Sequence, residues 1–114
     1  MGRYWSTRRA GSQGPPVATP VNSLGVPLTD LALSQDLPGG ALQAIWTPLI
    51  ETAPCRAYLY FSSTLVAPIE FSELIDVADG SWRFGQEGEP LQVWYVKVVT
   101  DGYDTVTSGP FTSS

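Results

Sequence analysis

From residue 28 onward, apolar and polar side chains alternate in short runs that Gly, Pro and Asp interrupt roughly every 8 to 12 residues. Alternation with a period of two is typical of strands whose two sides meet different surroundings. No segment has an apolar stripe of helical period long enough for an amphipathic helix. The pattern therefore predicts an all-β fold, an antiparallel seven-stranded β-sandwich. The expected strands are residues 28–34, 41–47, 56–63, 69–77, 81–84, 91–100 and 103–111.

The segments between these strands carry residues that are typical of turns. A turn is expected at residues 36–40 and a loop at 48–54, and Asp79-Gly80 and Asp101-Gly102 are both hairpin signals. Residues 69–77 are compatible with a strand or with a short helical turn, and both alternatives stay open.

Two of the expected strands, 56–63 and 91–100, are apolar on both faces, although a sandwich strand needs only one apolar face. The residues expected to point inward are Leu59, Phe61, Trp94, Val96 and Val98. The outward residues of these strands are expected to merge into an exposed patch of the kind that marks a protein interface. This patch consists of Tyr58, Tyr60, Val93 and Tyr95. The alternative is that the chain's own N-terminal residues or its 64–80 connection cover the patch.

The charges divide the chain into two regions of opposite sign. Residues 1–27 have a net charge of +3 and no acidic residue, whereas residues 28–114 carry three basic residues against 11 acidic ones, a net charge of −8. Because the first region is rich in Pro and Gly and lacks periodicity, we expect an extended basic arm followed by one sandwich domain, 28–114. The arm is expected to bind neighbouring protein subunits, since aromatic anchors and arginines suit an acidic protein surface. Its candidate partner-binding residues are Arg3, Tyr4, Trp5, Arg8 and Arg9.

The residues needed for most catalytic and metal chemistry are scarce. The chain has no His and a single Cys, so Cys55 has no His to activate it and cannot form an intrachain disulfide. Asp101 and Asp104 flank a turn, and two carboxylates are too few for calcium. No phosphate loop or nucleophile motif is present. We therefore predict that the chain is not an enzyme and uses no cofactor or metal.

Two further classes of partner are disfavoured. The acidic domain would repel the phosphates of a nucleic acid. No stretch of 18 apolar residues is present to span a membrane, and the segment after Arg8-Arg9 is too polar for an export signal.

Several short segments resemble fibronectin type III domains. Leu42, Ala44 and Trp46, followed by Pro48, resemble the second strand of that family, and Tyr58-Leu59-Tyr60 resembles the third. The run Trp94–Val98 resembles the sixth strand, and Ser108-Gly109-Pro110 resembles the last. The resemblance covers residues 28–114, is shared in part by other immunoglobulin-like sandwiches, and excludes the arm. The Leu-x-Pro-x-x-x-Tyr spacing of the family's tyrosine corner is missing, although Pro90 precedes Trp94.

The resemblance and the missing chemistry favour a structural module that binds other protein subunits within a large assembly. A bacteriophage virion component, such as a capsid decoration (cement) protein or a tail or baseplate accessory protein, would fit, since such domains are frequent there. It would be assembled in the host cytoplasm. The alternatives are a carbohydrate-binding or host-surface adhesion module, with Trp82 stacking on a glycan, and a cytoplasmic adaptor or part of a longer protein.

Overall fold

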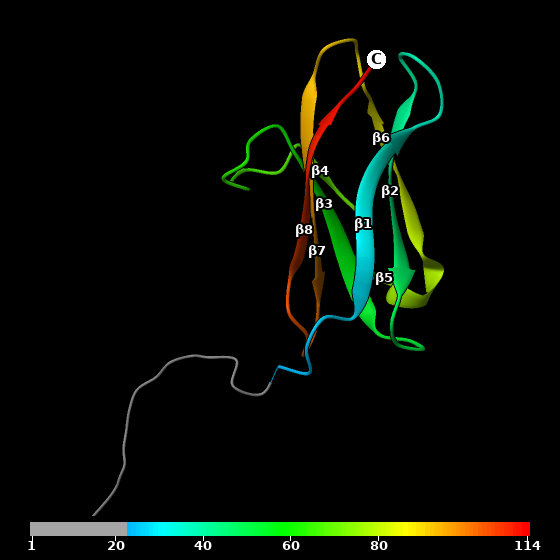
Figure 1. The fold of residues 1–114 in the computed structure, drawn as a ribbon, viewed down its shortest axis with the longest axis vertical. Coiled ribbons are helices and arrows are strands. Elements are labelled where there is room, and N and C mark those ends of the chain that lie inside the picture. The colour runs from blue at the N-terminus through cyan, green and yellow to red at the C-terminus, as the bar shows by residue number, and fades with distance from the viewer. Residues whose placement is uncertain (1–22) are drawn as a thin grey trace, which may run out of the picture.

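The computed structural model describes residues 23–114, and this part of the chain is built from strands and the turns that join them (Figure 1). The prediction of an all-β fold is confirmed. The described residues form eight strands rather than seven, because the expected strand at 69–77 is two separate short strands. The strands are β1 (Leu28–Gln35), β2 (Ala41–Pro48), β3 (Pro54–Tyr60), β4 (Glu70–Phe71), β5 (Ile75–Asp76), β6 (Ser81–Glu87), β7 (Val93–Thr100) and β8 (Val106–Thr112).

The strands form two antiparallel sheets that pack face to face (Figure 1). The three-stranded sheet has the order β1-β2-β6, and the five-stranded sheet has the order β4-β3-β7-β8, with β5 also paired to β3. The ladder between β3 and β7 runs in one uninterrupted register from Cys55↔Thr100 to Tyr60↔Tyr95. This ladder fixes which side chains share a face, because directly paired residues in an antiparallel ladder point to the same side.

Alternating residues of both sheets fill the space between them. Trp94, Val96 and Val98 are each 0% exposed, so their predicted inward orientation is confirmed. Two indole N–H groups are satisfied inside the fold: that of Trp46 donates to the carbonyl of Val77 at 2.7 Å, and that of Trp94 donates to the hydroxyl of Ser113 at 3.1 Å. The other core residues are Leu28, Leu31, Leu33, Leu42, Ala44, Ala53, Cys55, Ala57, Leu59, Val77 and Phe84.

The prediction of a hairpin at Asp79-Gly80 is wrong. A single 3-10 turn, Val77–Asp79, ends at Gly80, whose φ of 73° lies in the left-handed region that glycine adopts without strain. The backbone N–H of Ala78 donates to the side chain of Asp76, which caps this turn. The turn carries the chain from β5 in one sheet to β6 in the other, so the two strands are not hairpin partners. Of the two alternatives for 69–77, the segment thus forms two short strands, and the helical turn begins only at its last residue, Val77.

Ordered contacts begin within the predicted arm. The backbone N–H of Leu24 donates to the carbonyl of Gly102 at 3.0 Å, and that of Asp104 donates to the carbonyl of Gly25 at 2.8 Å. Residues 23–27 therefore belong to the packed structure and join the turn between β7 and β8. Within residues 23–114, no helix has the length and apolar character needed to cross a membrane.

Candidate functional site

The side of the five-stranded sheet that points away from the core carries aromatic, apolar and basic side chains. We call this surface the aromatic face. The neighbours of these residues along β3 and β7 are fully buried in the core, so strand alternation places the face on the outside. Its members are Arg56, Tyr58 and Tyr60 of β3, Phe71 of β4, and Val93, Tyr95, Lys97 and Val99 of β7.

Paired rings form the centre of the aromatic face. Tyr58 lies opposite Phe71 in the β3–β4 ladder, and their ring centroids are 5.8 Å apart. The ammonium of Lys97 lies 5.3 Å from the centroid of Tyr58 and 5.4 Å from that of Tyr60. A cation over aromatic rings is attracted by their negative faces, so these contacts hold the ammonium at the surface of the sheet.

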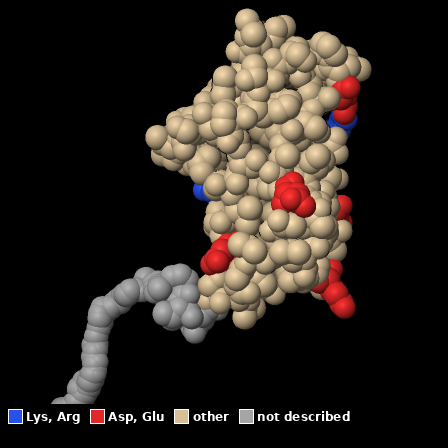
Figure 2. Space-filling model, in the orientation of Figure 1, with Lys and Arg blue, Asp and Glu red and all other residues tan. Residues whose placement is uncertain are grey.

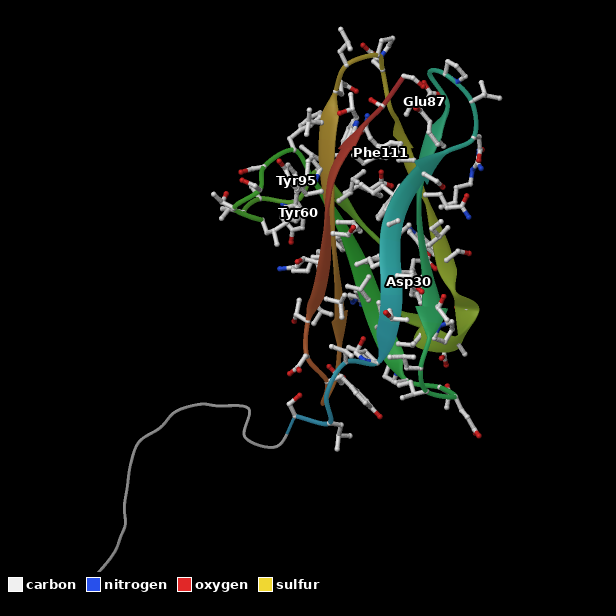
Figure 3. The ribbon with its side chains drawn as sticks, viewed as in Figure 1. Asp30, Tyr60, Glu87, Tyr95 and Phe111 are labelled. Carbon is white, nitrogen blue, oxygen red and sulfur yellow. The ribbon has the colours of Figure 1, made fainter. Side chains whose placement is uncertain are left out.

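Tyr60 does not lie on an exposed surface as predicted, because only 2% of it is accessible to solvent. It is outside the core cluster, so its burial comes from the outer side of the sheet. The 61–69 loop protrudes from that side directly beside Tyr60 and Tyr95 (Figure 3). The chain's own loop thus covers one end of the predicted patch, in agreement with the alternative weighed from the sequence.

The other predicted patch residues keep part of their surface. Tyr58 and Tyr95 are half-buried, and Val93 is 40% exposed. Tyr95 lies against Gly109 of β8, where a Cβ would come within 2.5 Å of the Tyr95 ring. Glycine at this position therefore makes room for the tyrosine on the aromatic face.

The 61–69 loop forms a wall at the end of the aromatic face and is itself apolar at its tip. Val66 is 68% exposed and lies between Leu65 and Ala67, whose φ values of 57° and 58° are left-handed. Such a conformation costs a residue with a Cβ about 1 kcal/mol or more and is enriched at binding sites. Ile69, at the base of the loop, is also 43% exposed and donates its N–H to the carbonyl of Leu59.

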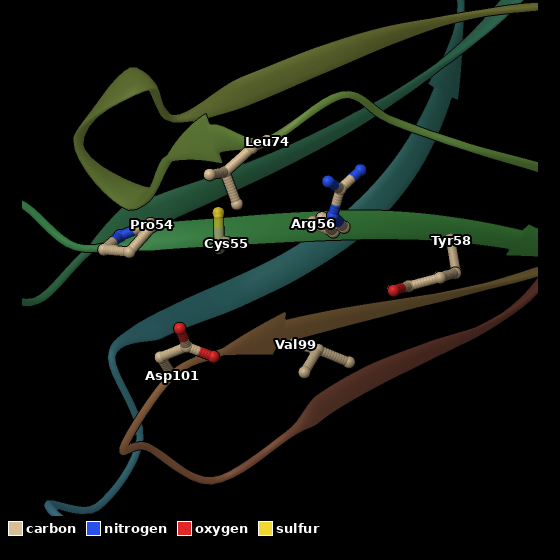
Figure 4. Close-up of a pocket in the computed structure, with 7 residues that line it drawn as sticks. All are labelled: Pro54, Cys55, Arg56, Tyr58, Leu74, Val99 and Asp101. Carbon is tan, nitrogen blue, oxygen red and sulfur yellow. The ribbon is translucent and has the colours of Figure 1, made fainter.

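A shallow hollow of about 270 Å³ opens at the opposite end of the face (Figure 4). One guanidinium nitrogen of Arg56 donates to the carbonyl of Ser72 at 3.0 Å, which holds this side chain beside the hollow. Burial, with smaller contributions from Asp76 and Asp79, raises the pKa of Cys55 to about 11, so its thiol stays protonated at neutral pH. The lining residues are Pro54, Cys55, Arg56, Tyr58, Leu74, Val99 and Asp101.

The edges of both sheets are poorly suited to pairing with another strand. β1 has a register shift between Thr29 and Ala32, and Pro110 deprives β8 of one N–H. On β6, the N–H of Gly85 donates to the carboxylate of Glu70 at 2.9 Å. β4 and β5 are each only two residues long. A partner therefore has better access to the aromatic face than to the backbone of an edge strand.

The remaining predicted site residues lie elsewhere. Trp82 shares the inward side of β6 with Phe84 and packs half-buried against the core, so only part of its ring is available to a glycan. The predicted arm residues lie outside the described part of the chain; they are Arg3, Tyr4, Trp5, Arg8 and Arg9. Within residues 23–114, no group of three or more potential metal ligands is brought together, and Asp104 accepts a hydrogen bond from the hydroxyl of Ser23.

Sequence reasoning missed Phe71, Arg56 and the apolar tip of the 61–69 loop as parts of this surface. Phe71 is 58% exposed and lies in residues 69–77, whose sequence is compatible with a strand or with a helical turn. Arg56 could have been found from its alternation with Tyr58, since both point to the same side of one strand. Comparisons with protein-family models, with curated proteins and with solved structures found no match to this chain.

Proposed function

We propose that this chain is a non-enzymatic structural module that binds neighbouring protein subunits of a large assembly through the aromatic face. The observation that carries this proposal is the apolar character of β3, β4 and β7 on the side away from the core. Phe71 and Val93 are 58% and 40% exposed there, although the opposite side of the same sheet already supplies the packing that the fold needs. A partner that covers such a surface removes apolar area from water, and this burial stabilises the complex by roughly 25 cal/mol per Å².

We further propose that the sandwich is of the fibronectin type III or immunoglobulin-like kind. Its grouping of β1, β2 and β6 against β3, β7 and β8 corresponds to the A-B-E and C-F-G grouping of those domains. The two tryptophans in the segments that resemble the family also support this assignment. Trp46 is 6% exposed and Trp94 is 0% exposed, and they belong to opposite sheets.

The assembly that we propose is a bacteriophage virion, with the chain acting as a capsid decoration protein or as a tail or baseplate accessory protein. This context rests on the frequency of such sandwiches in virions and thus on analogy of fold. In this proposal the basic arm binds a neighbouring subunit as well. Two linked contacts strengthen each other, because the first raises the local concentration of the second.

The test is sedimentation of particles from cells that produce the assembly together with the full chain. We expect the chain in the particle fraction, and we expect the double variant Phe71→Asp/Val93→Asp to be lost from it. The matched control is Ile45→Asp, which adds a carboxylate at a 39% exposed position on the outer side of the three-stranded sheet and should leave incorporation unchanged. Thermal unfolding of each purified variant separates a loss of binding from a loss of fold.

A wild-type chain found only as a free monomer would contradict the proposal, and so would a double variant that is incorporated normally. Removal of residues 2–22 tests the arm by itself. We expect reduced incorporation of a protein whose unfolding midpoint is unchanged.

A further inference from the structure

We infer that the aromatic face binds an acidic, extended segment of a partner polypeptide, with carboxylates at Lys97 and Arg56 and apolar side chains against Phe71 and Val93. This inference rests on the proposed function and specifies the chemistry of the partner.

The described part of the chain concentrates its unpaired positive charge on this face. Residues 23–114 contain only three basic residues against 11 acidic ones. Arg83, on the three-stranded sheet, forms an ion pair with Asp36, and no other ion pair within 4.0 Å occurs in this part of the protein. Arg56 and Lys97 thus have no carboxylate partner there, and residues 1–22 contain no Asp or Glu that could supply one.

The surroundings of Lys97 favour an incoming carboxylate. Lys97 as a residue is half-buried, and its ammonium lies 5.3 and 5.4 Å from the ring centroids of Tyr58 and Tyr60. A carboxylate that pairs with this ammonium also comes to lie beside the two rings, where the opposite charges attract each other at short range. In Figure 2 a basic side chain lies in the recess below the protruding 61–69 loop, while most of the acidic side chains in view lie on other parts of the surface.

Arg56 offers a second anchor beside the hollow. One of its nitrogens is bound to the carbonyl of Ser72, which orients the guanidinium and leaves its other donors for a ligand. Asp101 lies at the far side of the hollow (Figure 4) and would repel a carboxylate placed there. The favourable position for a carboxylate is therefore the side of Arg56 that faces away from Asp101 (Figure 4).

The ladder positions of Lys97 and Arg56 suit an extended segment. Lys97 is paired with Tyr58 and Val99 is paired with Arg56, so Lys97 and Arg56 are diagonal neighbours across the ladder. The backbone positions of diagonal neighbours are roughly 7–8 Å apart, close to the distance of about 6.7 Å between residues i and i+2 of an extended chain. Acidic residues two positions apart on one side of an extended segment thus have the same spacing as the ladder positions of Lys97 and Arg56.

The chain's own arm does not fit this surface. Its charges are all positive, so Arg3, Arg8 and Arg9 would be repelled by Lys97 and Arg56. The arm is better matched to the acidic surfaces of the domain or of a neighbour. The aromatic face and the arm are therefore expected to bind different partner surfaces.

The experiment titrates the isotopically labelled full-length chain with a soluble random copolymer of Glu and Tyr, followed by amide chemical shifts. We expect shifts at residues 56–60 and 95–99 and weaker binding as NaCl increases. Lys97→Met and Arg56→Met should each weaken binding roughly 3- to 10-fold, while Lys97→Arg should retain it. The matched control is Arg83→Met, which removes the third cation of the domain and should leave the affinity unchanged.

Unchanged affinity of the Lys97→Met/Arg56→Met double variant would overturn the inference, as would shifts confined to other surfaces. Equal binding of a Lys-Tyr copolymer would show that the aromatic rings act without charge selection and would also overturn it. If heparin or single-stranded DNA bound as tightly as the Glu-Tyr copolymer, the face would be a site for polyanions in general, and the inference of an acidic polypeptide partner would be wrong. If the chain formed a concentration-dependent dimer whose interface included Arg56 and Lys97, the partner would be the acidic surface of a second copy, and the inference of an extended acidic segment would be wrong.

The proposed function is tested separately by incorporation into particles. If Phe71→Asp/Val93→Asp prevents incorporation while the Lys97→Met/Arg56→Met variant is incorporated normally, the aromatic face binds protein and the inference about its acidic partner is wrong. If neither variant is lost from the particles, the proposed function itself is wrong.

Discussion

The two sheets of the sandwich bury similar apolar side chains on their inner sides and differ on their outer sides. The outer side of the three-stranded sheet carries mainly short or polar residues, with Ile45 as its exposed large apolar residue along β2. The outer side of the five-stranded sheet carries rings, valines and two unpaired cations. Folding requires apolar side chains only on the inner sides of the two sheets. The apolar side chains on the outer side of the five-stranded sheet therefore have a reason other than folding. Binding of another polypeptide to the aromatic face would supply this reason.

The largest expected effect on stability comes from the inner side of β7. Trp94→Ala should lower the free energy of unfolding by about 3–5 kcal/mol, because it removes a fully buried ring and leaves the Ser113 hydroxyl without its indole donor. Val93→Ala, one residue away on the outer side, should change it by less than about 1 kcal/mol. Urea unfolding followed by circular dichroism measures both. Equal losses would show that Val93 belongs to the packing of this molecule.

The two sides of the five-stranded sheet should also differ in thiol reactivity. In a Phe71→Cys variant, the new cysteine should react with iodoacetamide at pH 8 roughly 100-fold faster than Cys55, which is 1% exposed. Peptide mapping by mass spectrometry measures both rates in one sample. Comparable rates would mean that β3 opens easily.

The raised pKa of Cys55 also predicts that the stability of the fold depends on pH. This pKa of about 11 in the folded protein lies above the ordinary thiol value of 9.0, so the folded protein holds this proton more tightly than the unfolded chain does. The corresponding stability is complete below pH 9 and is lost as the pH rises towards 11. Cys55→Ala should flatten this alkaline decline in thermal unfolding, and an unchanged decline would assign it to other groups.

A smaller effect is expected where Tyr95 of the aromatic face meets β8. Gly109→Ala should cost about 1–3 kcal/mol, because its Cβ would lie 2.5 Å from the Tyr95 ring and 3.0 Å from the carbonyl of Trp94, at a φ of 140°. Gly102→Ala is the matched control, since its φ of 80° is also positive but no atom lies within 4 Å of the added Cβ. It should cost about 1 kcal/mol in chemical denaturation. If Gly109→Ala cost no more than the control, Tyr95 would not be held by β8.

The smallest effect is expected on the outer side of the three-stranded sheet. Arg83→Ala breaks the ion pair with Asp36. Because the side chains of Arg83 and Asp36 are 57% and 34% exposed, the loss should change the free energy of unfolding by less than about 0.5 kcal/mol. The unfolding midpoint at low and high salt measures this. A loss above about 1 kcal/mol would reveal a role of Arg83 in the packing of this sheet.

Much of the sandwich could be predicted because β2 and β7 are long and alternate strictly between buried and more exposed residues. Leu42, Ala44 and Trp46 are buried as expected, and so are the inward residues of β7. Phe61 was expected beside Leu59 in the interior, but β3 ends at Tyr60 and Phe61 is 47% exposed, with its ring 4.2 Å from that of Trp94. Strand ends are poorly determined by alternation, since the last paired residue depends on the partner strand.

The segment between β3 and β6 could not be predicted in the same way. β4 and β5 have two residues each, too few for any periodic signal, and they form because β3 offers them an edge. The burial of Tyr60 likewise depends on a loop that folds back over the sheet. Tyr60, one of the four residues of the expected patch, is therefore correctly placed on the outer side of the sheet but is buried rather than exposed.

The order of residues alone determined the inward and outward sides of the long strands, because the backbone turns successive side chains to opposite faces every second residue. It also determined the separation of charge between the first 27 residues and the rest. Only the tertiary structure decided that Arg56, Lys97, Tyr58 and Phe71 gather on one surface and that the 61–69 loop closes one end of it. Those neighbours come from pairing between distant strands, and short-range alternation carries no information about which strands will meet.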